Sequence, residues 1–269
     1  MFLYHKNSLE KNHYIVLSQC DNKEVLINSQ EFKLVSNICP HQKSLISLKS
    51  GQGIRICPYH NWSFDIYGKP ITSGRTEYYC QNDTALNTRS VFEWNSLLFD
   101  NPVHFDIDIS FENLVLMEER IDLVDANFKI IMDIFLDVDH IQSVHSGVYD
   151  LVGINNTEVS WKYYSNGSMQ IVEQGAVWIA HYPYTMIEWQ TGSLFVTVTK
   201  PLGKNQSKVH FFKYRDKNYL DRWQLNNHVW ETAWRQDRQQ AEILTEFVEN
   251  NLEPQKKHFR QFLKSNGIY

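Results

Sequence analysis

The chain has 269 residues and a formal net charge of −5 at pH 7, and 42% of its residues are hydrophobic while 21% are charged. That length allows one large domain or two modest ones, and the mildly negative charge gives no electrostatic reason to expect nucleic-acid binding. No apolar run approaches the roughly 20 residues that cross a bilayer, and the charged N-terminus lacks the apolar core of a signal peptide, so we expect a cytoplasmic protein without a membrane span.

The first part of the chain, up to about residue 105, reads as short strands and turns, and it contains the clearest chemical pattern. A Cys-Pro-His segment runs from Cys39 to His41, and a Cys-Pro-Tyr-His segment runs from Cys57 to His60. Such mixed pairs suit an asymmetric [2Fe–2S] cluster, in which the two cysteines bind one iron and the two histidines the other. Tetrahedral zinc is the alternative, although zinc knuckles usually pair cysteine with cysteine and histidine with histidine.

The rest of the chain reads as a helix, a run of strands and a closing helix. The first helix is predicted from about residue 127 to 144, and the last from about 219 to 250. An antiparallel meander with a long helix across it would form an α+β domain with a cavity between sheet and helix. The segments predicted as strands are 159–164, 169–172, 177–181, 186–190, 194–199 and 209–214.

A possible metal site lies at the end of the first predicted helix. At helical spacing, Asp137 shares an apolar face with Ile134 and Ile141, where a carboxylate is costly unless it is paired or bound to a cation. His140 lies one turn further on, and His145 follows five positions later, so both imidazoles can meet one ion if the helix kinks or ends there. A lone helical histidine is usually packed or exposed, but two beside a buried aspartate favour a metal.

The closing helix offers a carboxylate to complete this set. Two histidines and one carboxylate form a facial triad, which leaves open positions for O2 on Fe(II). Asp237 is the only ionisable member of an apolar stripe that includes Trp230 and Trp234. The alternative is a structural ion pair between Asp237 and a neighbouring arginine, Arg235 or Arg238.

These patterns resemble those of the Rieske non-haem iron oxygenases, the family of the aromatic ring-hydroxylating dioxygenase α subunits. Their second cluster loop usually reads Cys-Pro-Tyr-His-Gly-Trp, where residues 57–62 read Cys-Pro-Tyr-His-Asn-Trp. Their motif Asn-Trp-Lys, then Asp-x-x-His-x-x-x-x-His, resembles residues 127–145, and residues 236–238 resemble the segment that supplies their third iron ligand. Lys43 and Asn61 stand where the family often has glycine, and these departures bear on loop conformation and cluster potential rather than on ligation.

The resemblance implies an N-terminal all-β Rieske domain at 1–105 and a helix-grip-like catalytic domain at 106–269. A ferredoxin or flavin reductase, drawing on NAD(P)H, would reduce a cluster held by the four ligands named above. The cluster would pass electrons to mononuclear Fe(II) on His140, His145 and Asp237, where O2 is activated. A small organic substrate would then be hydroxylated or oxidatively demethylated.

The resemblance also implies a catalytic role for Asp137. In the family, electrons cross between the subunits of a head-to-tail homotrimer through an aspartate that bridges a cluster histidine and an iron-binding histidine. Asp137 occupies that position, with His41 or His60 of the neighbouring subunit as its partner. As a hydrogen-bonding neighbour it would also orient His140.

Two other functions remain open from the sequence. One is a non-catalytic Rieske electron carrier whose C-terminal part binds a ligand or docks a partner, and the other is a redox or iron sensor. Within the oxygenase interpretation, monohydroxylation or demethylation is favoured over dihydroxylation, by family analogy, because the chain is small and would work without a β subunit.

The sequence does not identify the substrate. An aromatic cage for a quaternary ammonium group and a flat slot for an aromatic ring are both compatible with the aromatic residues of the predicted sheet. Core packing is the ordinary role of each of these residues. The candidates for lining the pocket are Trp161, Trp178, Tyr182, Tyr184 and Trp189.

Overall fold

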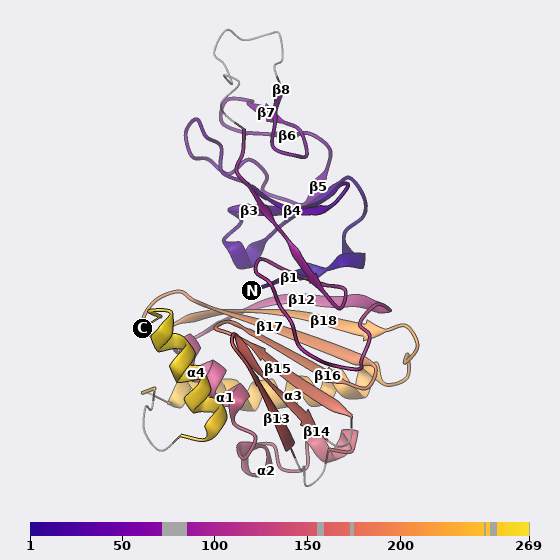
Figure 1. The fold of residues 1–269 in the computed structure, drawn as a ribbon, viewed down its shortest axis with the longest axis vertical. Helices are drawn as coiled ribbons and strands as arrows, with labels where there is room; N and C mark the ends of the chain where they lie inside the picture. The colour runs from indigo at the N-terminus through magenta and orange to yellow at the C-terminus, as the bar shows by residue number, and fades with distance from the viewer. Residues whose placement is uncertain (72–84, 155–158, 173–174, 245, 248–251, 269) are drawn as a thin grey trace. The chain divides into compact units, whose positions relative to one another are not determined.

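The computed structural model describes residues 1–269 with the exception of 72–84, 155–158, 173–174, 245, 248–251 and 269. The chain divides into two compact units, Phe2–His104 and Phe105–Tyr269, and Met1 groups with the second unit (Figure 1). Among the described residues, no helix is both long enough and apolar enough to span a membrane.

The N-terminal unit consists of short antiparallel strands and two single turns of 3-10 helix, η1 (Lys6–Ser8) and η2 (Ser18–Cys20). Its strands are β1 (Phe2–His5), β2 (His13–Val16), β3 (Glu24–Asn28), β4 (Phe32–Ser36), β5 (Gly51–Gln52), β6 (Arg55–Ile56), β7 (Ser63–Phe64), β8 (Pro70–Ile71), β9 (Thr88–Ser90), β10 (Phe92–Trp94) and β11 (Leu97–Phe99). They form a five-stranded sheet of order β5-β2-β3-β4-β9 and two three-stranded sheets, β6-β7-β8 and β1-β11-β10.

The core of this unit includes two of the predicted cluster ligands. Val25 on β3, Val35 on β4 and Phe64 on β7 pack in one buried cluster, and Cys39 and Cys57 belong to the same cluster. The loops that carry the cysteines follow β4 and β6, which belong to two different sheets, and both cysteines lie on the inside of the unit.

The C-terminal unit is built on a seven-stranded antiparallel sheet. Its strands are β12 (Leu114–Val124), β13 (Val159–Tyr164), β14 (Gly167–Val172), β15 (Ala176–His181), β16 (Thr185–Gln190), β17 (Ser193–Pro201) and β18 (Ser207–Asp216). The order across the sheet is β12-β18-β17-β16-β15-β14-β13, so β13 to β18 form the predicted meander and β12 adds to its far edge.

Helices cover one face of this sheet (Figure 1). They are α1 (Phe128–Leu136), α2 (His140–Val144), η3 (Tyr149–Val152), α3 (Trp223–Ile243) and α4 (Pro254–Ser265). On α3, the Trp230 ring stacks 5.3 Å from Phe195 of β17, and the Trp234 ring meets Phe211 of β18 edge-on at 4.9 Å. These aromatic contacts bury the apolar stripe of α3, which leaves its other face to solvent.

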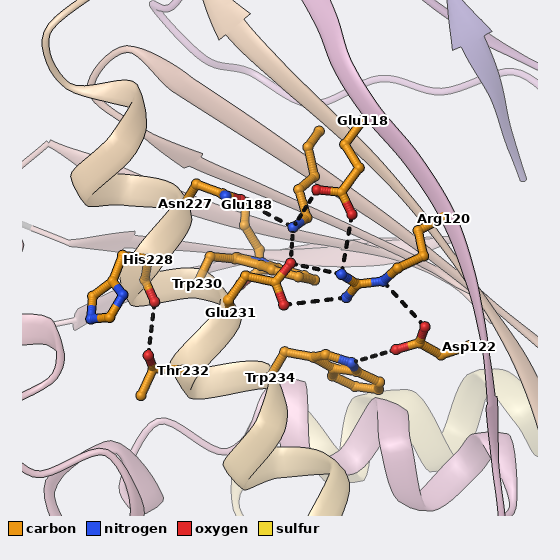
Figure 2. Close-up of polar contacts among 11 residues, drawn as sticks. Glu118, Arg120, Asp122, Glu188, Asn227, His228, Trp230, Glu231, Thr232 and Trp234 are labelled. Atoms are coloured by element: carbon orange, nitrogen blue, oxygen red, sulfur yellow. Dashed lines mark hydrogen bonds and ion pairs between the residues drawn. The ribbon is translucent and has the colours of Figure 1, made fainter.

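A network of charges fixes α3 on the sheet (Figure 2). Lys213 of β18 is fully buried, and its Nζ contacts Glu231 of α3 and lies 3.1 Å from Glu118 of β12. Arg120 of β12 bonds Glu231 at 2.8 Å, and the indole N–H of Trp234 donates to Asp122 at 3.0 Å. Because a buried lysine requires paired carboxylates, this network fixes the position of α3 on the sheet.

The predicted fold class is confirmed, since an all-β N-terminal unit precedes an antiparallel sheet covered by a long helix. The single helix predicted at 127–144 is wrong, because the chain turns extended at Asp137 (φ −90°, ψ 104°) between α1 and α2. Asp137 Oδ1 accepts the backbone N–H of His140 at 3.3 Å. Such local bonds compete with helical hydrogen bonds, which explains the break.

The closing helix also differs from its prediction. Helix α3 ends at Ile243 instead of continuing to 250, and part of that stretch lies outside the described residues. The sequence analysis missed α4, which begins with Pro254 in its first turn. Its buried residues include the polar Gln255 and Arg260 as well as Phe259, so few apolar residues mark its buried face.

Candidate metal centres

Two similar loops of the N-terminal unit carry the four predicted cluster ligands. In each, the cysteine N–H donates to the carbonyl five residues later, Cys39 to Ser44 and Cys57 to Trp62, both at 2.8 Å. The amide four residues on donates back to each cysteine carbonyl, at 3.0 Å and 2.9 Å. The two cysteines are 2% and 1% exposed, whereas both histidines are exposed. The loops therefore place thiols on the inside and imidazoles on the outside.

The side chains are grouped as an asymmetric cluster requires. The rings of His41 and His60 lie 4.7 Å apart, and His41 stacks on Trp62 at 4.8 Å. Burial raises the pKa of the Cys39 thiol, a nearby backbone hydrogen bond from His41 opposes this, and the adjacent Cys57 thiol adds to the rise. Because a cysteine binds a metal as the thiolate, binding of an Fe–S cluster would release the protons of the two thiols. Adjacent thiols and adjacent imidazoles fit the [2Fe–2S] ligand set.

The two residues that replace family glycines have left-handed backbones. Lys43 and Asn61 both have φ of 59°. Asparagine tolerates this conformation, but for lysine it costs about 1–2 kcal/mol because Cβ approaches the carbonyl oxygen. Both loops thus adopt the conformation that glycine favours without having glycine.

The second candidate centre lies between the sheet and α3 in the C-terminal unit. His140 begins α2, His145 follows its end, and Asp237 projects from the middle of α3. Asp237 Oδ1 lies 2.9 Å from His145 Nε2 and 3.2 Å from His140 Nε2, and the two Nε2 atoms lie 3.0 Å apart. The structure therefore brings together the three residues predicted as metal ligands.

These separations have the dimensions of a facial triad. Donor atoms at neighbouring corners of an octahedron with bonds of about 2.1 Å lie about 3.0 Å apart, whereas tetrahedral corners would lie about 3.4 Å apart. The alternative in which Asp237 pairs with an arginine is wrong, because Arg238 bonds Glu242 and the carbonyl of Leu123, and Arg235 is exposed.

Hydrogen bonds and charges prepare this site for a cation. His145 Nδ1 lies 2.7 Å from Gln236 Oε1, which can only accept, so Nδ1 carries the proton and Nε2 faces the centre. Burial alone would raise the pKa of Asp237, but hydrogen bonds to His140 and His145 hold it below its usual value. Burial alone would lower the pKa of His145, but Asp237 and Gln236 raise it. A metal ion would take the place of the proton shared by these groups.

The Asp137 side chain contacts the candidate ligand His140 only at its backbone N–H. Its Oδ1 accepts the His140 N–H, and its Oδ2 lies 2.7 Å from Lys256 Nζ on α4. The His140 Nδ1 atom is buried and has no hydrogen-bond partner among the described residues. The predicted bond between Asp137 and the His140 ring is therefore not formed in this structure.

A cavity of about 30 Å3 adjoins the three ligands. Of the five aromatic candidates, Trp178 lines it, whereas Tyr182 packs on Phe259 of α4 with ring centroids 5.0 Å apart. Sequence reasoning missed Tyr149, Gln170 and Glu188, which also line the cavity and are buried. In the sequence, Gln170 and Glu188 are marked only as polar residues within apolar strands, and Tyr149 carries no such mark.

Glu188 is the one carboxylate of this cavity wall on the sheet. Its Oε2 accepts the indole N–H of Trp230, which projects from α3, at 3.0 Å (Figure 2). Burial raises the pKa of Glu188 to about 7, although the Trp230 bond lowers it; the charge of Asp237 adds to the rise, and that of His145 opposes it.

Comparisons with known proteins agree with this architecture. Residues 1–79 match the family described as the Rieske [2Fe-2S] domain. A putrescine 2-hydroxylase from Ralstonia nicotianae is 22% identical over 245 residues, covering 75% of this chain and 66% of the relative. Another putrescine 2-hydroxylase, from Bordetella bronchiseptica, is also 22% identical and is covered over 55% of its length. The alignments thus span between about half and two thirds of these relatives.

Solved structures have the same fold along the whole chain. The quaternary ammonium Rieske monooxygenase CntA, in complex with L-carnitine, superposes with a TM-score of 0.77 at 17% identity, covering 100% of this chain and 88% of that one. Naphthalene 1,2-dioxygenase from Rhodococcus sp. has a TM-score of 0.71 at 14% identity, covering 100% and 89%. The chain therefore carries a Rieske [2Fe–2S] domain, and its fold is that of the Rieske non-haem iron oxygenases. The Rieske domain and the oxygenase fold predicted from the sequence are thereby confirmed.

Proposed function

We propose that the chain is the terminal oxygenase component of a Rieske-type system, which hydroxylates a small organic substrate with O2. One observation carries the proposal: His140, His145 and Asp237 present three donor atoms 2.9 to 3.2 Å apart at a buried cavity. A non-catalytic electron carrier or a sensor built on the Rieske cluster alone has no use for such a site, which disfavours those alternatives.

Each centre has residues suited to its role. The four cysteine and histidine ligands of the N-terminal loops would hold the [2Fe–2S] cluster, and the triad would hold Fe(II). When bound, the cluster supplies single electrons and the mononuclear iron supplies the reaction with O2. Gln236 keeps the His145 ring oriented, and Asp237 provides one negative charge. Ile141 and Met186 contribute apolar surface to the cavity, which limits water near the reacting atoms.

Partners and location complete the proposal. A ferredoxin or flavin reductase would supply electrons in the cytoplasm, and a homotrimer would bring a neighbour's cluster to Asp137. Asp137 forms an ion pair with Lys256, since burial alone would lower the pKa of Lys256 but Asp137 raises it. The sequence relatives named as 2-hydroxylases favour monohydroxylation over dihydroxylation.

The test is anaerobic reconstitution with iron and sulfide, followed by a substrate screen that monitors oxygen uptake with a surrogate reductase. The proposal expects about three Fe per chain and uptake that depends on substrate and yields a hydroxylated product. About two Fe per chain, with no substrate-dependent uptake, would instead support the carrier. Asp237→Ala is the informative variant, and Glu242→Gln, on the outer side of the same helix, is its control.

A further inference from the structure

Three side chains form a polar row on the cavity wall that faces α3. Gln170 of β14 lies directly opposite Trp178 of β15, which lies directly opposite Glu188 of β16. Their exposed fractions are 1%, 5% and 7%, and all three line the cavity beside the metal ligands. The row therefore presents an amide, an indole and a carboxylate across three neighbouring strands.

Most polar atoms of this row lack partners among the described residues. Both amide atoms of Gln170 and the Nε1 of Trp178 are buried without a hydrogen bond. Glu188 bonds Trp230 through Oε2 alone, and its Oε1 has no donor in the described part of the chain. Leaving such groups unpaired costs about 1–3 kcal/mol each. Gln170 Nε2 and Trp178 Nε1 can only donate, whereas Gln170 Oε1 and Glu188 Oε1 accept, so the two oxygens suit a ligand with hydrogen-bond donors.

The charge of the wall favours a cation. No lysine or arginine is among the described residues that line the cavity, and Glu188 has no basic partner within the sheet. The rings of Tyr149 and Trp178 meet edge-on at 5.9 Å beside it. A carboxylate beside aromatic rings, as Glu188 is beside Tyr149 and Trp178, is an arrangement that attracts ammonium groups.

The size of the cavity limits the group that can enter. A volume of about 30 Å3 has room for one or two water-sized groups, whereas an engineered cavity that holds benzene is about 150 Å3. An ammonium head group is close to water in size. A primary ammonium also carries N–H donors for Gln170 Oε1, which has no partner among the described residues, and for Glu188, which accepts only the Trp230 bond on Oε2, whereas a quaternary ammonium has none.

We propose that this cavity binds the head group of a protonated primary aliphatic amine, with Glu188 as its counter-ion and Gln170 as a second acceptor. The inference rests on the proposed function, because it takes the cavity beside the iron ligands as the substrate cavity. Glu188 and Gln170 are then the residues that select a cationic aliphatic substrate against a neutral or aromatic one.

The test is calorimetric titration of the reconstituted protein with n-butylamine, 1-butanol, tetramethylammonium and benzyl alcohol. We expect n-butylamine to bind at least about 10-fold more tightly than the other three, since hydrogen bonds to charged groups contribute about 10- to 100-fold. Equal or weaker binding of n-butylamine would overturn the inference, and this comparison needs no variant.

Variants then assign the effect to residues. Glu188→Gln keeps the shape of the side chain and an acceptor for Trp230, and we expect it to weaken n-butylamine binding about 10- to 100-fold with unchanged iron content. Gln170→Leu should weaken it by a smaller factor, and Glu242→Gln, an exposed control, should leave it unchanged. A Glu188→Gln variant that loses iron while keeping its preference for the amine would show that Glu188 balances the metal instead, which contradicts the inference.

Failure here is distinguishable from failure of the proposed function. If the protein holds three Fe per chain and consumes O2 only with neutral or aromatic compounds, the amine inference falls and the oxygenase stands. If the protein holds only the cluster iron and no compound stimulates O2 uptake, the oxygenase falls, and the inference falls with it.

Discussion

The orientation of His145 by Gln236 gives a sharp test of the metal site. In Gln236→Leu, the side chain keeps a similar volume but loses the oxygen that accepts the His145 Nδ1–H at 2.7 Å. The imidazole can then rotate or shift its proton to Nε2, the atom that faces the other two ligands. Loss of such a supporting bond typically lowers metal affinity 10- to 100-fold, which corresponds to about 1.4–2.7 kcal/mol.

The assay is anaerobic titration of the mononuclear site with Co(II) in competition with a chromophoric chelator, on protein with an intact cluster. Gln236→Glu retains an acceptor and should keep the affinity within about 3-fold of the original. Gln239→Leu is the matched control, because Gln239 is exposed on the same helix. An unchanged dissociation constant in Gln236→Leu would refute the orienting role, and an equal loss in Gln239→Leu would attribute the effect to the helix.

Three further predictions concern other parts of the chain. Glu231→Gln should lower the free energy of unfolding by about 2 kcal/mol at pH 7, because it leaves the fully buried Lys213 short of one carboxylate. Burial alone would raise the pKa of Glu231, but its cationic partners hold it below 4.5, so this contribution is complete above pH 4.5 and disappears as the pH falls through the lower folded-state pKa. Denaturant unfolding of both proteins at several pH values checks this, and a pH-independent difference would contradict it. Lys43→Gly should raise the free energy of unfolding by up to about 1 kcal/mol, and with it the melting temperature, because it relieves a left-handed lysine, and Asn61→Gly should raise both less; the reverse order in thermal unfolding would disprove the strain assignment. Asp137→Asn should keep both metal centres but lose most turnover, measured as substrate-dependent oxygen uptake, and near-normal uptake would remove its bridging role.

The residues of both candidate centres could be proposed from the sequence because each leaves a mark in it. The cysteine and histidine pairs stand out by their spacing alone, and Asp237 stands out as the one acid in an apolar helical stripe. The meander of β13 to β18 was visible because its strands are short apolar runs separated by turns. These features depend on local periodicity and composition, which a single sequence contains.

The remaining features depend on contacts between distant segments. Lys256 meets Asp137 across 119 residues, and Gln236 meets His145 across 91, so neither pairing has a local signal. Helix α4 escaped notice because Arg260, paired with Asp133, occupies a buried position that an apolar residue would normally mark. The polar row of the cavity wall likewise becomes visible only once strand register is known.

The iron-to-sulfide ratio tests the existence of two metal centres most directly. Iron and acid-labile sulfide are measured in reconstituted wild type and in Asp237→Ala, with Glu242→Gln as the control. The account predicts about three Fe to two sulfides in the wild type and the control, and about two to two in Asp237→Ala. A wild-type ratio of about two to two, or a ratio unchanged by loss of Asp237, would contradict it.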